Sequence, residues 1–251
     1  MRRALAALVL VTAAASIPGA AAGRGIGLSA SPLRLRLKGA ASGVVVVRNP
    51  GHRTLLVDVS RAGFARSLGG KPRVRAAHGS ARWLRMRPKR IRIAPGAKGV
   101  LHIRAVPTRG AAPGDHPALV LLTSRPLGVK HVRVRLRVGV IVDLRVHGRI
   151  VRSLDARALT VRRSGALRLL ELRLVNRGNV TERLAADGLR VSLLRDGRRR
   201  VTLRPRSREL LPHSAGIAVF AYRGRLRGTV LARVELRPPV RGAQRSFLVR
   251  L

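Results

Sequence analysis

The stretch VVVVRNPGHRTLLVDV, residues 44–59, places an Asn-Pro-Gly turn between an apolar run and a run of alternating apolar and polar residues. Two short extended segments joined by such a turn are typical of a β-hairpin. A second stretch, LRLVNRGN at residues 172–179, also ends an apolar strand pattern in Asn-x-Gly. A proline-marked turn follows each Asn-x-Gly, at Pro95 and Pro212. Each half of the chain is therefore predicted to be one copy of a related fold.

Alternation with a period of two extends outward from these hairpins. In SPLRLRLK, residues 31–38, three leucines alternate with basic residues, and HVRVRLRVGV, residues 131–140, repeats the pattern with valines and one leucine. Such alternation predicts half-buried antiparallel strands with the apolar residues on the core side. Turn signals separate many further short strands. The predicted fold class is all-β, with two tandem immunoglobulin-like β-sandwiches.

The amino-terminal residues predict an extracytoplasmic protein. Two arginines, a short apolar segment and a run of small residues ending at Ala22 are typical of a secretory signal peptide, predicted to be cleaved after residue 22. An uncleaved amino-terminal anchor is the alternative. No second apolar segment approaches membrane-spanning length, so no transmembrane anchor is expected after cleavage. The predicted domains are 24–147 and 148–251, and the protein is expected to be secreted or associated with the cell surface.

The formal net charge of +43 admits two explanations. It favours an anionic partner, such as a wall polymer, because polyanion binding releases condensed counterions. It is equally consistent with a compositional excess of arginine on solvent faces. An aromatic content of 2% argues against a nucleic-acid partner, which needs stacking residues. The candidate polymer-binding residues are two ladders of alternate strand positions: Arg34, Arg36, Lys38, Arg133, Arg135 and Arg137.

The residues give no support for an enzyme, a cofactor or a metal site. The chain has no cysteine, and its seven histidines lack metal-ligand spacing. The adjacent Asp115 and His116 follow Pro-Gly, so Asp115 is interpreted as the cap of a turn. Trp83 heads an alternating segment and is expected to fill the core of the first domain. Thr181 belongs to a glycosylation-like triplet but is interpreted as a strand residue.

The motifs SPLRLRL, VVVVRNPGHRTLLVDV and WLRMRPKRIRIAPGAKGVLHIRAVPTRGAAPGDHPALVLL resemble the first domain of two-domain bacterial surface proteins of the WxL-interacting type. LELRLVNRGNVTERL and LLPHSAGIAVFAYRGRLRGTVLARVEL are similar to their second domain. The resemblance implies a non-enzymatic cell-envelope binding or adhesion protein that contacts peptidoglycan and a surface protein partner. Members commonly carry a carboxy-terminal membrane helix, which this sequence lacks.

One strand supports an alternative function. VRVRLRVGVIVDLRV, residues 132–146, resembles the last first-domain strand of periplasmic pilus chaperones. In those proteins alternating apolar residues of an edge strand complete the sheet of a subunit. The sequence therefore leaves two functions open, a wall-binding or adhesion module and a chaperone-like protein that binds subunits by strand addition.

Overall fold

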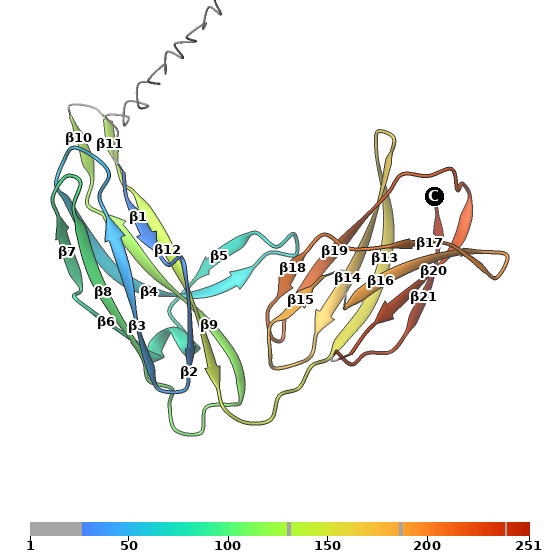
Figure 1. Ribbon diagram of the computed structural model, residues 1–251, viewed down its shortest axis with the longest axis horizontal. Coiled ribbons are helices and arrows are strands. Elements are labelled where there is room, and N and C mark those ends of the chain that lie inside the picture. Colours follow the sequence, from blue (N-terminus) through green and yellow to red (C-terminus); the bar gives the residue numbers. More distant parts are fainter. Residues whose placement is uncertain (1–26, 130–131, 186–187, 239) are drawn as a thin grey trace, which may run out of the picture.

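The chain forms two all-β domains, which lie side by side in the computed structural model (Figure 1). The predicted signal peptide, residues 1–22, lies outside the described residues, which are 27–129, 132–185, 188–238 and 240–251. The strands of the first domain and one short 3₁₀ helix have these bounds: β1 Ser29–Ser31, β2 Arg34–Lys38, β3 Ala41–Arg48, β4 Leu55–Arg66, β5 Pro72–Arg75, η1 Gly79–Trp83, β6 Leu84–Arg87, β7 Arg90–Ile93, β8 Lys98–Ala105, β9 Gly114–Ser124, β10 Leu127–Val129, β11 Val132–Val134 and β12 Arg137–Val146.

The first domain is a sandwich of two sheets. Its four-stranded sheet has the order β1-β3-β8-β6, and its six-stranded sheet has the order β2-β12-β9-β4-β5 with β7 paired to β4. The hairpin β10–β11 extends the β9–β12 pair (Figure 1). Alternate residues of both sheets point inward and fill the core, for example Val45, Leu101, Val120 and Val142. The alternation predicted over residues 131–140 leads into this core at Val140.

The second domain is built in the same way from shorter sheets. Three strands pair in the order β13-β14-β19, four in the order β17-β16-β20-β21, and β15 pairs with β18. Phe220 and aliphatic residues of both sheets form its core. The prediction of two immunoglobulin-like sandwiches is confirmed. The strand bounds are β13 Leu154–Ser164, β14 Leu167–Asn176, β15 Glu182–Leu184, β16 Leu189–Arg195, β17 Arg198–Leu203, β18 Arg208–Leu210, β19 Ala215–Tyr222, β20 Thr229–Leu236 and β21 Arg245–Arg250.

The central strand β9 is buried on both faces, which explains its continuous apolar run ALVLL at residues 118–122. Ala118, Val120 and Leu122 face the core of the first domain. Leu119 and Leu121 lie on the outer face and form a separate cluster with Ala62, Phe64 and Leu211. Leu211 belongs to the second domain, so this apolar cluster joins the two domains.

The hairpin β4–β5 is a second link between the domains. It extends from the first domain toward β18 and β19 of the second (Figure 1). At its tip the Leu68 carbonyl accepts hydrogen bonds from the Ile217 backbone N–H, at 3.0 Å, and from the Arg208 guanidinium, at 3.1 Å. The same guanidinium donates to the Ile217 carbonyl. The hairpin tip therefore caps part of the β19 edge.

Three predicted strand positions differ from the expectation. Leu33 is 57% exposed, because β2 begins only at Arg34 after the chain crosses from one sheet to the other. The stretch 131–140 is interrupted between β11 and β12, where Leu136 exchanges hydrogen bonds with Ser124 at 2.8 and 2.9 Å. Trp83 closes η1 and is only partly buried. It packs on the edge of the core and against the ring of His116.

Candidate functional site

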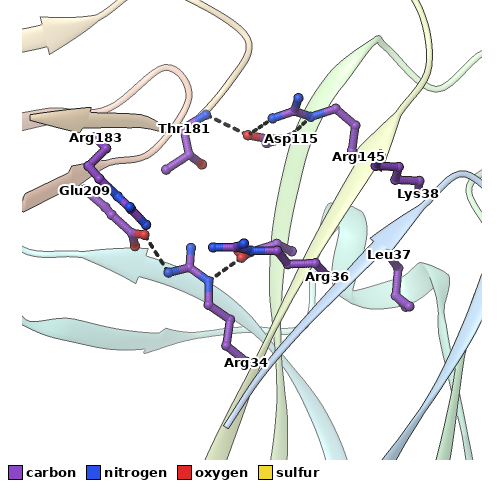
Figure 2. A pocket seen from close by; sticks show the side chains of 10 residues that line it. Arg34, Arg36, Leu37, Lys38, Asp115, Arg145, Thr181, Arg183 and Glu209 are labelled. Atoms are coloured by element: carbon purple, nitrogen blue, oxygen red, sulfur yellow. Dashed lines mark hydrogen bonds and ion pairs between the residues drawn. The ribbon is translucent and has the colours of Figure 1, made fainter. Parts of the chain in front are cut away.

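A pocket of about 300 Å³ opens between the two domains. Strands β2, β9 and β12 of the first domain form one side, and the segment from Thr181 to Arg183 with Glu209 forms the other (Figure 2). Five of its side chains are cationic and three are carboxylates. The lining residues are Arg34, Arg36, Leu37, Lys38, Asp115, Asp143, Arg145, Thr181, Arg183 and Glu209.

Glu209 bridges two arginines of the first domain. One carboxylate oxygen accepts from Arg34 Nη1 at 2.6 Å and the other accepts from Arg66 Nη2 at 3.0 Å. Arg34 also donates to Asp143 on the neighbouring strand β12. Burial alone would raise the pKa of Glu209, but the hydrogen bonds and charges of Arg34 and Arg66 outweigh it and lower that pKa. The carboxylate therefore stays ionised and holds β2 and the β4–β5 hairpin to the second domain.

Asp115 links the domains at the other end of the pocket, and its interpretation as a turn cap is wrong. Its carboxylate accepts from both Arg145 Nη2, at 2.9 Å, and the Thr181 backbone N–H, at 2.8 Å (Figure 2). Burial acts to raise the pKa of Asp115, but the bonds from Arg145 and Thr181 outweigh it and lower that pKa. Thr181 thus contributes its backbone N–H to the interface and precedes β15 rather than lying within a strand.

Next to this pair, Glu182 has a different electrostatic environment. Its side chain is 2% exposed. Oε2 accepts from Arg152 at 3.1 Å, whereas Oε1 has no hydrogen-bond partner among the described residues. Burial raises the pKa of Glu182 above its ordinary value, because desolvation disfavours the charged form more strongly than Arg152 stabilises it.

Three cations of the pocket remain available to a ligand. Within the described part of the chain, Arg36, Lys38 and Arg183 take part in no ion pair. Arg34 and Arg145, in contrast, are held by carboxylates. The pocket therefore has an excess of positive charge and suits a single anionic group.

A second candidate site is the free edge formed by β11 and the start of β12, residues 132–140, here named the β11–β12 edge. β2 pairs with β12 only along Ile141–Arg145. The side of β12 that faces away from β9 is therefore free along Arg137–Val140. The side of β11 that faces away from β10 is likewise free along Val132–Val134, since no described strand supplies hydrogen-bond partners at either place. An edge with unpaired N–H and C=O groups can accept another extended chain.

Apolar side chains accompany this free edge. Val138 packs on the edge of the core, Leu136 is partly exposed and Val134 is 38% exposed. They continue the row of Val140 and Val142, which are fully buried. The row of core residues therefore continues toward the hairpin tip and becomes progressively exposed, offering apolar contacts at every second position.

The two predicted arginine ladders lie at these two sites. Arg34, Arg36 and Lys38 line the pocket between the domains, although Arg34 is already engaged by carboxylates. Arg133, Arg135 and Arg137 are exposed on the β11–β12 edge. Binding of an anionic polymer by these six residues stays a prediction. The sequence pattern does not indicate Asp115 and Glu209 as interface residues, because their partners in the other domain, Thr181 and Arg34, lie 66 and 175 residues away in the chain.

No helix within the described residues is long and apolar enough to cross a membrane. The same residues contain no group of three or more His, Cys, Asp or Glu side chains placed to hold a metal ion.

Comparison with known proteins relates the fold to one class of solved structures. No family model matches the chain, and no curated protein is detectably similar in sequence. The class 5 fimbriae chaperone CfaA superposes with a TM-score of 0.50 at 11% identity, covering 90% of this chain and 100% of that one. A chain of a chaperone–tip adhesin complex from CFA/I fimbriae biogenesis also gives 0.50 at 11% identity, with 89% and 98% covered. The chain thus has the two-domain immunoglobulin-like fold seen in fimbrial chaperones.

Proposed function

We propose that this protein is a non-enzymatic, extracytoplasmic chaperone for the subunits of a surface fibre, and that it binds a subunit by strand addition along the β11–β12 edge. One observation carries the proposal: the unpaired edge of Arg137–Val140 continues a row of core residues into solvent. A partner strand laid there would extend the six-stranded sheet, and its backbone would pair with these unpaired groups. The fold shared with fimbrial chaperones supports this function.

The structure favours this function over wall binding because strand β2 limits how far an added partner strand could extend along β12. β2 occupies the same side of β12 from Ile141 onward, where it lies opposite Arg34. An added strand would therefore end beside Leu33, which is 57% exposed, and next to the cationic pocket. A repeating polymer needs no such boundary. The earlier resemblance to WxL-interacting proteins remains a sequence-based expectation.

A photo-crosslinking experiment in the native cell tests the proposal. A photoreactive amino acid replaces Val134, and the protein that becomes crosslinked to it is identified. That protein is then co-purified with the unmodified chain to obtain the complex. Hydrogen exchange of the complex should show slower exchange at residues 137–140. The substitution Leu136→Asp should abolish the complex, because it places a charge in an apolar contact. Leu248→Asp is the matched control, since Leu248 is 76% exposed in the second domain.

The same assay separates strand addition from polymer binding. Changing Arg133, Arg135 and Arg137 together to Gln should leave the subunit complex largely intact, because backbone pairing and apolar contacts hold it. Wall recognition would be the function instead if two results were found together. Purified cell wall would retain the parent protein and the Leu136→Asp variant, and it would not retain the triple Gln variant. A complex that forms without slower exchange at 137–140 would also refute strand addition.

A further inference from the structure

The outer face of the four-stranded sheet carries like charges directly opposite one another. Arg85 of β6 lies opposite Arg104 of β8, and Arg48 of β3 lies opposite Lys98 of β8. None of the four strands of this sheet contains Asp or Glu. Like charges at directly opposite positions of an antiparallel pair destabilise the sheet. This face therefore retains a repulsion that neighbouring side chains do not relieve.

The other sheet of the same domain is arranged differently. Each of its three carboxylates has an arginine at the opposite register position: Arg90 lies opposite Asp58, Arg145 opposite Asp115, and Arg36 opposite Asp143. Arg145 also lies opposite Lys38, but it forms an ion pair with Asp115. All three acidic residues of the first domain thus lie on the six-stranded sheet. An even compositional excess of arginine would not produce this difference between two sheets of one domain.

The like-charged face is also hollowed. A groove of about 830 Å³ runs over β6 and β8, and its cations are Arg85, Arg87, Lys89 and Arg104, with His102 among them. Val106 lines the same groove and is 43% exposed. A concave surface lined by charges of one sign concentrates the field and attracts an anion of complementary shape.

We propose that this groove binds an extended acidic segment of a protein partner. Arg85 and Arg87 are two residues apart on one strand, which separates them by about 6.6 Å. Acidic residues at alternate positions of an extended peptide have the same spacing, so two carboxylates can face two guanidinium groups in register. Arg104, opposite Arg85, adds a second donor to one of these carboxylates.

The shape and chemistry of the groove favour a peptide over other anions. A flat membrane cannot enter a groove. A polysaccharide or phosphate polymer would leave Val106 of the groove in water. It would also leave Val44 of β3 in water, which is 45% exposed and lies opposite His102 of the groove. A peptide can cover both valines with apolar side chains while its carboxylates meet the arginines. The groove lies on a different sheet from the β11–β12 edge, so this inference does not depend on the proposed function.

Two octapeptides of equal composition test the inference, (Ser-Glu)₄ and (Ser-Ser-Glu-Glu)₂, because only the first has glutamates two residues apart. Fluorescence anisotropy in physiological salt measures their affinity for the full-length protein. We expect the alternating peptide to bind about fivefold more tightly or better, since only it matches the strand spacing. Changing Arg85, Arg87 and Arg104 together to Gln should weaken its binding about tenfold, because the charge-assisted contacts are lost.

Two controls separate the groove from total charge and from folding. Changing Arg198, Arg199 and Arg200 to Gln removes the same charge from an exposed hairpin of the second domain and should leave the affinity nearly unchanged. Arg104→Glu replaces a like-charged pair with a complementary one, so its melting temperature should not fall while peptide binding is lost. Equal losses in both triple variants, or equal affinity for the two peptides, would overturn the inference. Binding of anionic phosphatidylglycerol vesicles that depends on the groove arginines, without any peptide preference, would also overturn it.

Discussion

Asn49 of the first domain and Asn176 of the second make the same set of hydrogen bonds. Asn49 Nδ2 donates to the carbonyl four residues later, at Arg53, and to two consecutive carbonyls beyond, at Ile93 and Ala94. Its Oδ1 accepts from the Gly51 N–H at 3.0 Å. Asn176 repeats the pattern with Val180, Leu210 and Leu211, and its Oδ1 accepts from the Gly178 N–H at 2.9 Å. Both residues are buried.

These equivalent amides predict equivalent losses of stability. Asn49→Asp and Asn176→Asp keep the size of the side chain and the acceptor for the glycine N–H, but remove the donors to three carbonyls. Each substitution should lower the free energy of unfolding by about 2–4 kcal/mol, because it leaves buried polar groups unpaired and adds a charge. Urea denaturation of the full chain measures this. Thr202→Ala, on an edge strand, is the control, and a change as small as the control would contradict the prediction.

The Asn pair also shows how much of the fold could be predicted. The Asn-x-Gly turns and the period of two depend on neighbouring residues, so the sequence predicts the hairpins, the strands and the duplication. Asn49 could be placed at a turn, but its contact with Ile93 could not, because nothing in the local pattern indicates which distant carbonyls face it. The two domains share only the Asn and the Gly of this turn in sequence, yet the structure shows that they share the whole set of hydrogen bonds made by the asparagine.

The candidate site was harder to predict for the same reason. Arg34 and Glu209 are 175 residues apart, and their contact depends on how the domains are packed. Leu33 looked like a core residue because alternation does not show where a strand crosses between sheets. One feature of the sequence does indicate part of the interface. The unbroken apolar run 118–122 predicts a strand buried on both faces, and hence a covering element outside the sandwich.

Trp83 provides a test of partial burial. Its ring packs on the core edge and 4.9 Å from the His116 ring, between centroids, rather than filling the core. Trp83→Ala should therefore cost about 2–3 kcal/mol, less than the 3–5 kcal/mol typical of a fully buried ring. Thermal and urea denaturation measure the loss, and Trp83→Phe should recover part of it. A loss of 4 kcal/mol or more would show that the ring is a central core residue.

The bridge at Glu209 predicts a pH-dependent stability. Because the pKa of Glu209 is lowered in the folded protein, its ionised form stabilises the fold above the ordinary value of 4.5. This contribution is lost as the pH falls below 4.5 and through the lowered pKa. Glu209→Gln should cost about 1–2 kcal/mol at pH 7, and the difference from the parent should vanish in acid. A difference that stayed constant from pH 7 to pH 3 would show that the charge of Glu209 is not involved.

Glu182 should show the opposite dependence. Its pKa is raised in the folded protein, so the unfolded chain releases this proton first as the pH rises above 4.5. Stability linked to Glu182 is therefore greatest below 4.5 and is lost as the pH rises through the raised pKa. Glu182→Gln should be at least as stable as the parent at pH 7, by up to about 1 kcal/mol, and should lose this advantage in acid.

The control for Glu182 is Glu171→Gln, which removes one carboxylate from an ion pair with a more exposed arginine, Arg162. Unfolding free energies of all three proteins are measured in urea from pH 3 to pH 8. If Glu182→Gln were destabilised by more than 2 kcal/mol at pH 7, the ion pair with Arg152 would outweigh the cost of burial.

The interface around Leu211 predicts how the two domains depend on each other. Each domain has its own core, so residues 24–147 and 148–251, expressed separately, should both give β-type circular dichroism. The first piece should be the more affected by separation, because it loses the side chain that covers Phe64, Leu119 and Leu121. It should bind a hydrophobic dye that the full chain does not bind.

In the full chain, Leu211→Ala should lower the free energy of unfolding by about 2 kcal/mol, at the small end of the range for buried leucines, because the cluster is small and lies between domains. Leu248→Ala, at a side chain that is 76% exposed, should change it by less than about 0.5 kcal/mol. If Leu211→Ala were as silent as Leu248→Ala, the apolar cluster would not couple the domains. The arrangement of the two domains would then depend only on the contacts of Glu209, Asp115 and the β4–β5 hairpin. In that case the double variant Leu211→Ala with Glu209→Gln would lose no more unfolding free energy than Glu209→Gln alone.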